Sequence, residues 1–176
     1  MSYFHISVDN QIGPVGALVS GVDLSQPLSA DVIQEIHAAW LRHHVLFFRD
    51  QELSPSAQAR FASYFGELDQ YPFMKPVDDS AYVIPIVKEA GATMNFGGDW
   101  HTDTSYKSYP PKATLLYAVE VPEQGGDTLF ADATAAYAAL SSAMRVSLES
   151  WQGIYSPKLV HGQGGDYKSV AAKENL

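Results

Sequence analysis

Cysteine is absent from the 176 residues of this chain. Its absence excludes a disulfide scaffold, a zinc site built from thiolates and a cysteine nucleophile. Any metal ion bound by side chains must therefore be held by His, Asp or Glu.

Positive charge is scarce, since 11 Lys and Arg stand against 20 Asp and Glu and the net charge is −9. No run of Lys or Arg forms a basic face, so we expect no nucleic-acid partner. The sequence also has no apolar stretch long enough to span a bilayer and no signal peptide at its first residues. These absences predict a cytoplasmic protein with no membrane partner.

The chain has no repeat or linker, and 46% of its residues are apolar. This composition predicts one compact domain over residues 1–176 with a real core. Three apolar segments bounded by Gly, Pro or charged residues have the composition of strands. They are Val15–Val19, Val45–Phe48 and Ala113–Val121.

Helix starts are indicated by residues that cap the first turn. The predicted caps are Ser29, Ser54, Asp132 and Ser141. Pro55 directly follows the second cap, where proline suits the first helical position. From this pattern of segments we expect an α+β, β-rich fold, a barrel or jelly roll with flanking helices.

His101 and Asp103 form a His-x-Asp pair within Trp100-His-Thr-Asp103. On an extended strand, residues i and i+2 point to the same side, so both side chains could reach one ion. Imidazole and carboxylate with one further His form the facial triad of non-haem Fe(II) oxygenases. About 0.4 such pairs are expected by chance, and the alternative for Asp103 is a surface turn in which it accepts backbone hydrogen bonds.

The surrounding residues resemble the TauD/TfdA family, the taurine dioxygenase family of Fe(II)- and 2-oxoglutarate-dependent dioxygenases. The core signature consists of Trp100–Asp103, Tyr109–Pro111, Leu115–Ala118, Pro122 and Gly125–Phe130. The opening Gly16–Leu24, Arg42–Gln51 and Phe65–Leu68 is also similar to that of the family. The resemblance covers nearly the whole chain to about Tyr155 and matches the N-terminal portion of the family.

The resemblance implies a double-stranded β-helix (jelly-roll, cupin-like) core and a dioxygenase that hydroxylates a small organic substrate. O2 and 2-oxoglutarate would be its co-substrates, with succinate and CO2 released. It also implies that His101 and Asp103 are catalytic Fe(II) ligands. Thr128 matches the position whose hydroxyl binds 2-oxoglutarate, although Gly125–Thr128 also has the pattern of a tight turn.

The primary substrate stays open among sulfonates, aryloxyacetates, sulfate esters and amino-acid derivatives, and so does homo-oligomer formation. Tyr71 and Gly97 fall near the positions where the resemblance implies a His and an Asn that hold the sulfonate of taurine, and neither residue matches. Tyr71, Asn95 and Thr104 are therefore candidates for contacting another substrate, with ordinary loop roles as the alternative. We expect Trp100 to pack beside the metal and Tyr117 in the sheet.

The family's third iron ligand and its oxoglutarate-binding Arg lie downstream of the residues of this chain. We therefore expect the chain to lack the C-terminal part of the domain. His161 is the only histidine after Asp103, and a loop histidine is the favoured interpretation. Two alternatives stay open. The first is a catalytically incompetent β-barrel module or truncated homologue that binds small acids. The second is a hydrolytic zinc site, which is disfavoured because no third His or Glu stands at helical spacing beside the pair.

Overall fold

The computed structural model describes residues 2–10, 15–72, 74–89, 91 and 98–156. Two compact units are distinguished within the chain. Unit 1 comprises Met1–Ala57 and Tyr117–Gln152, and unit 2 comprises Gln58–Leu116 and Gly153–Leu176. A single domain over residues 1–176 stays a prediction.

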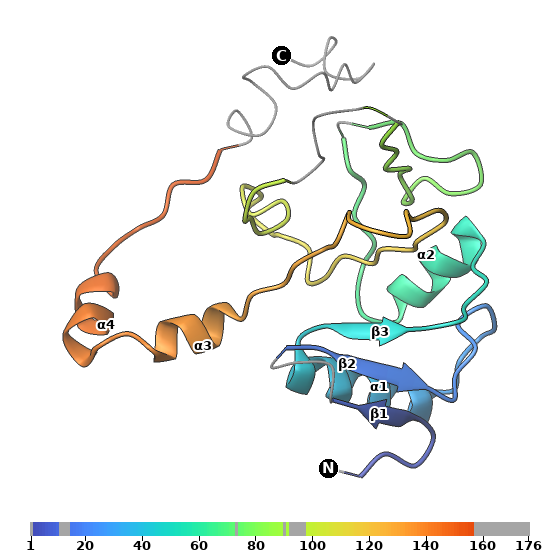
Figure 1. The fold of residues 1–176 in the computed structure, drawn as a ribbon, viewed down its shortest axis with the longest axis horizontal. Helices are drawn as coiled ribbons and strands as arrows, with labels where there is room; N and C mark the ends of the chain where they lie inside the picture. Colours follow the sequence, from blue (N-terminus) through green and yellow to red (C-terminus); the bar gives the residue numbers. More distant parts are fainter. Residues whose placement is uncertain (1, 11–14, 73, 90, 92–97, 157–176) are drawn as a thin grey trace. The chain divides into compact units, whose positions relative to one another are not determined.

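Unit 1 contains a small mixed sheet of three strands in the order β1-β2-β3 (Figure 1). The strands are β1 (Ser7–Asp9), β2 (Ala17–Ser20) and β3 (Leu46–Phe48). The β1 strand is antiparallel to β2, and β2 is parallel to β3. The β2 and β3 strands confirm the first two predicted segments, whereas β1 was not predicted.

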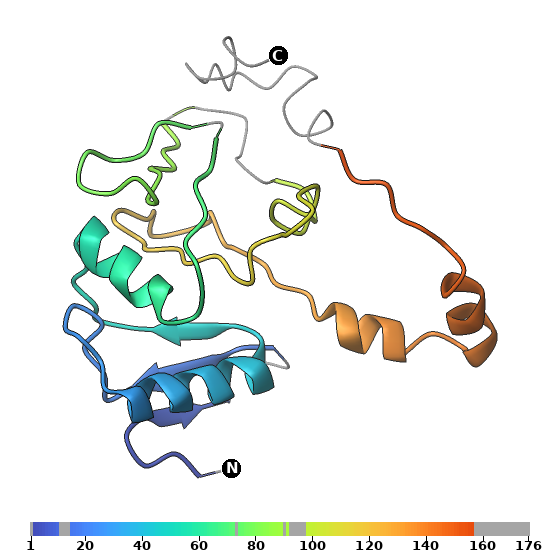
Figure 2. The same cartoon turned by 180° about the vertical axis from the view of Figure 1, so that it is seen from behind.

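Helix α1 (Ala30–His43) connects β2 to β3 and packs on one face of the sheet, as Figure 2 shows from behind. Its start is set by the predicted cap, because the Ser29 side chain accepts a hydrogen bond from the Val32 amide. Ile36 and Ala39 on this helix are buried, as are Ala17 and Val19 of β2. These apolar side chains form the core of unit 1.

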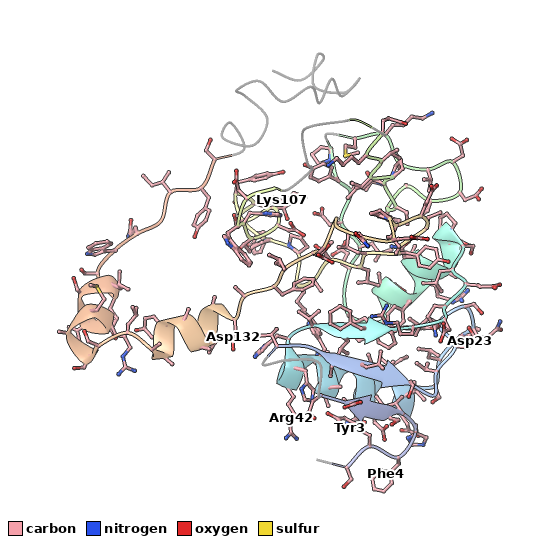
Figure 3. The ribbon with its side chains drawn as sticks, viewed as in Figure 1. Tyr3, Phe4, Asp23, Arg42, Lys107 and Asp132 are labelled. Atoms are coloured by element: carbon pink, nitrogen blue, oxygen red, sulfur yellow. The ribbon has the colours of Figure 1, made fainter. Side chains whose placement is uncertain are left out.

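The other three predicted helix starts are also confirmed, because each cap oxygen accepts an amide of the first turn. Helix α2 (Pro55–Ser63) follows Ser54, α3 (Ala133–Ala138) follows Asp132, and α4 (Ser142–Leu148) follows Ser141. Figure 3 labels Asp132 at the start of α3. None of the helices in the described ranges is long and apolar enough to cross a membrane.

The predicted strand Ala113–Val121 is wrong, because this segment contains no strand. A strand requires a hydrogen-bonded neighbour, and the ladders described between residues 2 and 156 join only β1, β2 and β3. Leu116 and Val119 of the segment are 64% and 87% exposed. The described residues contain four helices and one three-stranded sheet, so they do not by themselves display the expected jelly-roll core.

Candidate metal centre

His101 and Asp103 lie in an irregular part of unit 2 and not on a strand, so the expected strand geometry is wrong. The two side chains nevertheless converge, because His101 Nε2 lies 3.0 Å from Asp103 Oδ1. Their side chains are 51% and 49% exposed. The structure therefore brings the predicted pair together at a site open to solvent.

The imidazole of His101 is oriented by a main-chain carbonyl. His101 Nδ1 lies 2.7 Å from the carbonyl oxygen of Asp99, which can only accept a hydrogen bond. Nδ1 must therefore carry the hydrogen, which leaves Nε2 as the ring nitrogen available to a metal ion. A histidine ligand whose other nitrogen is held in this way has a fixed ring orientation.

The two carboxylate oxygens of Asp103 have different partners. Oδ1 faces His101 Nε2, and Oδ2 accepts a hydrogen bond of 2.7 Å from the hydroxyl of Thr114. The carboxylate thus presents one oxygen to the histidine and has the other occupied.

The separation of the two donor atoms fits a divalent ion of the first transition row. Bonds of about 2.1 Å from nitrogen and oxygen that meet at a right angle place the two donors about 3.0 Å apart. The observed distance between His101 Nε2 and Asp103 Oδ1 is 3.0 Å. The same distance is also that of an ordinary N–H···O hydrogen bond.

A third ligand does not appear beside the pair. Across the described parts of the chain, no three His, Cys, Asp or Glu side chains come together as a metal site. His161, the alternative ligand considered from the sequence, lies outside the described residues. Iron ligation by His101 and Asp103 stays a prediction, and a facial triad would need one further ligand.

The loop that follows the pair is fixed within unit 2. Lys107, labelled in Figure 3, forms an ion pair with Asp69, and its amide donates to the carbonyl of Thr104 at 3.0 Å. Thr104 has a φ of 46°, in the left-handed region that β-branched residues rarely adopt. Its hydroxyl oxygen is buried and has no hydrogen-bond partner among the described residues.

The remaining substrate candidates are only partly described. Tyr71 is half-buried in unit 2, and Asn95 and Gly97 lie outside the described residues. Contact of Tyr71, Asn95 or Thr104 with a substrate stays a prediction.

The two aromatic residues expected in the core are placed differently. Trp100 is 70% exposed, so the expected packing of its side chain is wrong. Tyr117 does not belong to a sheet, and its hydroxyl donates to the carbonyl of Gln51 at 3.2 Å. The expectation for Tyr117 depended on a strand that does not form over residues 113–121.

Thr128 lies in unit 1 and is exposed. It follows Gly125 and Gly126, whose φ angles of 78° and 75° are in the left-handed region that glycine favours. These φ angles suit a turn, but no turn is assigned over residues 125–128, so the turn stays a prediction. The role of Thr128 in binding 2-oxoglutarate stays a prediction.

Comparison with known proteins identifies relatives along almost the entire chain. Residues 8–175 match the family described as "Taurine catabolism dioxygenase TauD, TfdA family". The alkylsulfatase of Acinetobacter baylyi is 34% identical over 85% of this chain and 47% of its own length. The alpha-ketoglutarate-dependent sulfate ester dioxygenase of Pseudomonas putida is 36% identical over 82% of this chain and 47% of its own length.

Two solved structures have a fold similar to that of this chain. A taurine dioxygenase from Burkholderia xenovorans matches with a TM-score of 0.71 and 31% identity, over 87% of this chain and 55% of its own. AAD-2, solved in complex with Mn(II) and N-oxalylglycine, matches with a TM-score of 0.60 and 28% identity, over 82% of this chain and 49% of its own. The present chain spans about half the length of the curated relatives it matches. The family match and these likenesses agree, and the chain belongs to the TauD/TfdA family of taurine catabolism dioxygenases.

Proposed function

We propose that the protein is an Fe(II)- and 2-oxoglutarate-dependent dioxygenase that hydroxylates a small organic substrate. The observation that carries this proposal is the convergence of His101 Nε2 and Asp103 Oδ1 at 3.0 Å. Family membership supports the same activity, because several relatives are named alpha-ketoglutarate-dependent dioxygenases.

The reaction converts 2-oxoglutarate, O2 and a C–H bond of the substrate into succinate, CO2 and an alcohol. Bound Fe(II) supplies the redox chemistry that activates O2. His101 and Asp103 hold the ion, with the imidazole orientation fixed by the Asp99 carbonyl. Thr128 donates its hydroxyl to the far carboxylate of 2-oxoglutarate, which favours the correct orientation of the co-substrate.

We also propose that the core of the whole protein is a double-stranded β-helix (jelly roll). The TM-score of 0.71 to a taurine dioxygenase structure supports this fold. The described part contributes the small mixed sheet of unit 1 and the loop that carries the His-x-Asp pair.

Sulfate esters are the substrate class to test first. One relative is named an alkylsulfatase and another a sulfate ester dioxygenase, and each is at least 34% identical to this chain. Hydroxylation of the carbon that bears the sulfate would give an unstable hemiacetal-like ester that releases sulfate and an aldehyde. Aryloxyacetates and sulfonates are the comparison classes, because other relatives carry these substrates in their names.

The test is succinate release by the purified intact protein supplied with Fe(II), 2-oxoglutarate, O2 and a medium-chain alkyl sulfate. We expect succinate and inorganic sulfate in equal amounts. Omitting Fe(II) is the control. If Fe(II) and 2-oxoglutarate bind but no substrate class yields succinate, the protein is a small-acid-binding module and the proposed activity is wrong.

A further inference from the structure

We propose that Thr114 is a positioning residue that holds one oxygen of Asp103 away from the metal and thereby presents the other oxygen to it. This inference rests on the proposed function, since it assigns Asp103 as a ligand. It adds a residue that the His-x-Asp motif does not contain.

The contact between Thr114 and Asp103 is a side-chain hydrogen bond. The Thr114 hydroxyl donates to Asp103 Oδ2 at 2.7 Å, the usual length of an O–H···O hydrogen bond. Oδ1 remains for the metal, 3.0 Å from His101 Nε2. Hydrogen bonds to ligating carboxylates fix the orientation of the ligand and raise metal affinity.

Thr114 can act in this way because the residues on both sides of it are hydrogen-bonded, one to helix α2 and the other to Phe65. Lys112 Nζ donates to the carbonyl of Phe65, just beyond the end of α2, at 3.2 Å. Gln58 Nε2, on α2, donates to the carbonyl of Leu115 at 3.2 Å. Neither bond belongs to a sheet, so these side chains replace the strand pairing that the segment lacks.

Solvent access makes this restraint necessary. The Asp103 side chain is 49% exposed, so packing alone does not restrict rotation of its carboxylate. With the Thr114 hydroxyl in place, the carboxylate is limited to the rotamer that directs Oδ1 toward the imidazole. Without it, Oδ2 would bond to water and the carboxylate would sample orientations that do not suit the metal.

The experiment compares Thr114→Val with Thr114→Ser in the intact protein. Valine keeps the shape and removes the donor, whereas serine keeps the donor and removes a methyl group. The readouts are the affinity for Mn(II), measured by the loss of its free-ion electron paramagnetic resonance signal, and the visible absorption of the Co(II)-loaded protein. We expect Thr114→Val to weaken Mn(II) binding by about tenfold or more and to change the Co(II) spectrum. Thr114→Ser should stay within about threefold of the wild type in affinity and keep its spectrum.

Equal Mn(II) affinity in wild type and Thr114→Val would overturn the proposal, and so would an equal loss in Thr114→Ser. Far-UV circular dichroism of the metal-free variants shows whether each folds, and Thr114→Ala replaces valine if that variant does not. Failure of the proposed dioxygenase activity is recognised separately. In that case the wild type releases no succinate, while its metal affinity still depends on the Thr114 hydroxyl.

Discussion

At the scale of single residues, the candidate site consists of two side chains, and one polar atom of each already has a hydrogen-bond partner. The Asp99 carbonyl holds His101 Nδ1, and the Thr114 hydroxyl holds Asp103 Oδ2. The two atoms left over, Nε2 and Oδ1, face each other. This division of roles explains how a half-exposed loop can present two ligands in a defined geometry.

His101→Ala and Asp103→Ala should each abolish succinate formation and leave the fold intact. Both side chains are half exposed, so neither contributes to the core, and each removal takes one ligand from the iron. Succinate assays and far-UV circular dichroism are the measurements. Asp79→Ala is the matched control, because Asp79 is an exposed aspartate of the same unit. Substantial turnover by either site variant would contradict the ligand assignment.

Thr128→Val should raise the KM for 2-oxoglutarate and have little effect on kcat. A hydrogen bond to a charged group is worth about 1.5–3 kcal/mol, which corresponds to a change of about tenfold to a hundredfold in KM. Initial rates at varied 2-oxoglutarate provide the measurement, with Thr128→Ser as the variant that keeps the hydroxyl. An unchanged KM would leave Thr128 with a role only in the turn after Gly126.

At the scale of elements, predictions based on neighbouring residues, such as the helix starts, are confirmed. The prediction of the Ala113–Val121 strand, which depends on a pairing partner elsewhere in the chain, is wrong. A cap residue and the first turn are adjacent in sequence, so all four helix starts could be identified from residues such as Ser29 and Asp132. The Ala113–Val121 segment has the composition of a strand, but strand formation depends on a partner that composition does not reveal. The three-residue β1 was missed because it is too short for an alternating pattern to appear.

The junction between the N-terminal segment and α1 depends on one carboxylate. Glu35 on α1 accepts hydrogen bonds from the amides of Phe4, His5 and Ile6, and His5 Nδ1 lies 3.1 Å from its Oε1. Desolvation by itself raises the pKa of Glu35, but these hydrogen bonds together outweigh it and lower the pKa to about 2, from 4.5. The ionised form is therefore favoured by folding.

Glu35→Gln should lower the melting temperature at neutral pH, and the difference from the wild type should shrink in acid. A depressed pKa stabilises the folded state above the unfolded pKa of 4.5, and this stabilisation is lost as the pH falls to about 2. Melting temperatures between pH 7 and pH 2 measure it. Glu89→Gln, at an exposed glutamate, is the control. A difference that persists unchanged at the acid end would show that the glutamine alters packing and not charge.

At the scale of the whole molecule, the site could be predicted only as far as neighbours in sequence determine it. The two predicted ligands, His101 and Asp103, are two residues apart, and the local backbone brings their side chains together without a strand. Thr114 is eleven residues beyond Asp103, and a threonine at that distance has no pattern that marks it. The contact of Thr114 with Asp103 depends on how the segment around Thr114 is held by α2. The sequence alone does not show this arrangement.

Binding of a metal ion should stabilise the whole molecule through the pair in unit 2. A ligand that binds only the folded state adds about 2.7 kcal/mol of stability at one hundred times its Kd, so Mn(II) should raise the melting temperature and a chelator should reverse the rise. His101→Ala should remove this increment, because it takes away one of the two described ligands. Glu35→Gln should keep the increment, because the hydrogen-bond partners of Glu35 are the amides of Phe4, His5 and Ile6, and effects at sites that share no partners usually add. Differential scanning calorimetry of the three proteins at pH 7 measures both effects. If His101→Ala keeps the increment, Mn(II) binds elsewhere and the convergence of His101 and Asp103 serves only the loop.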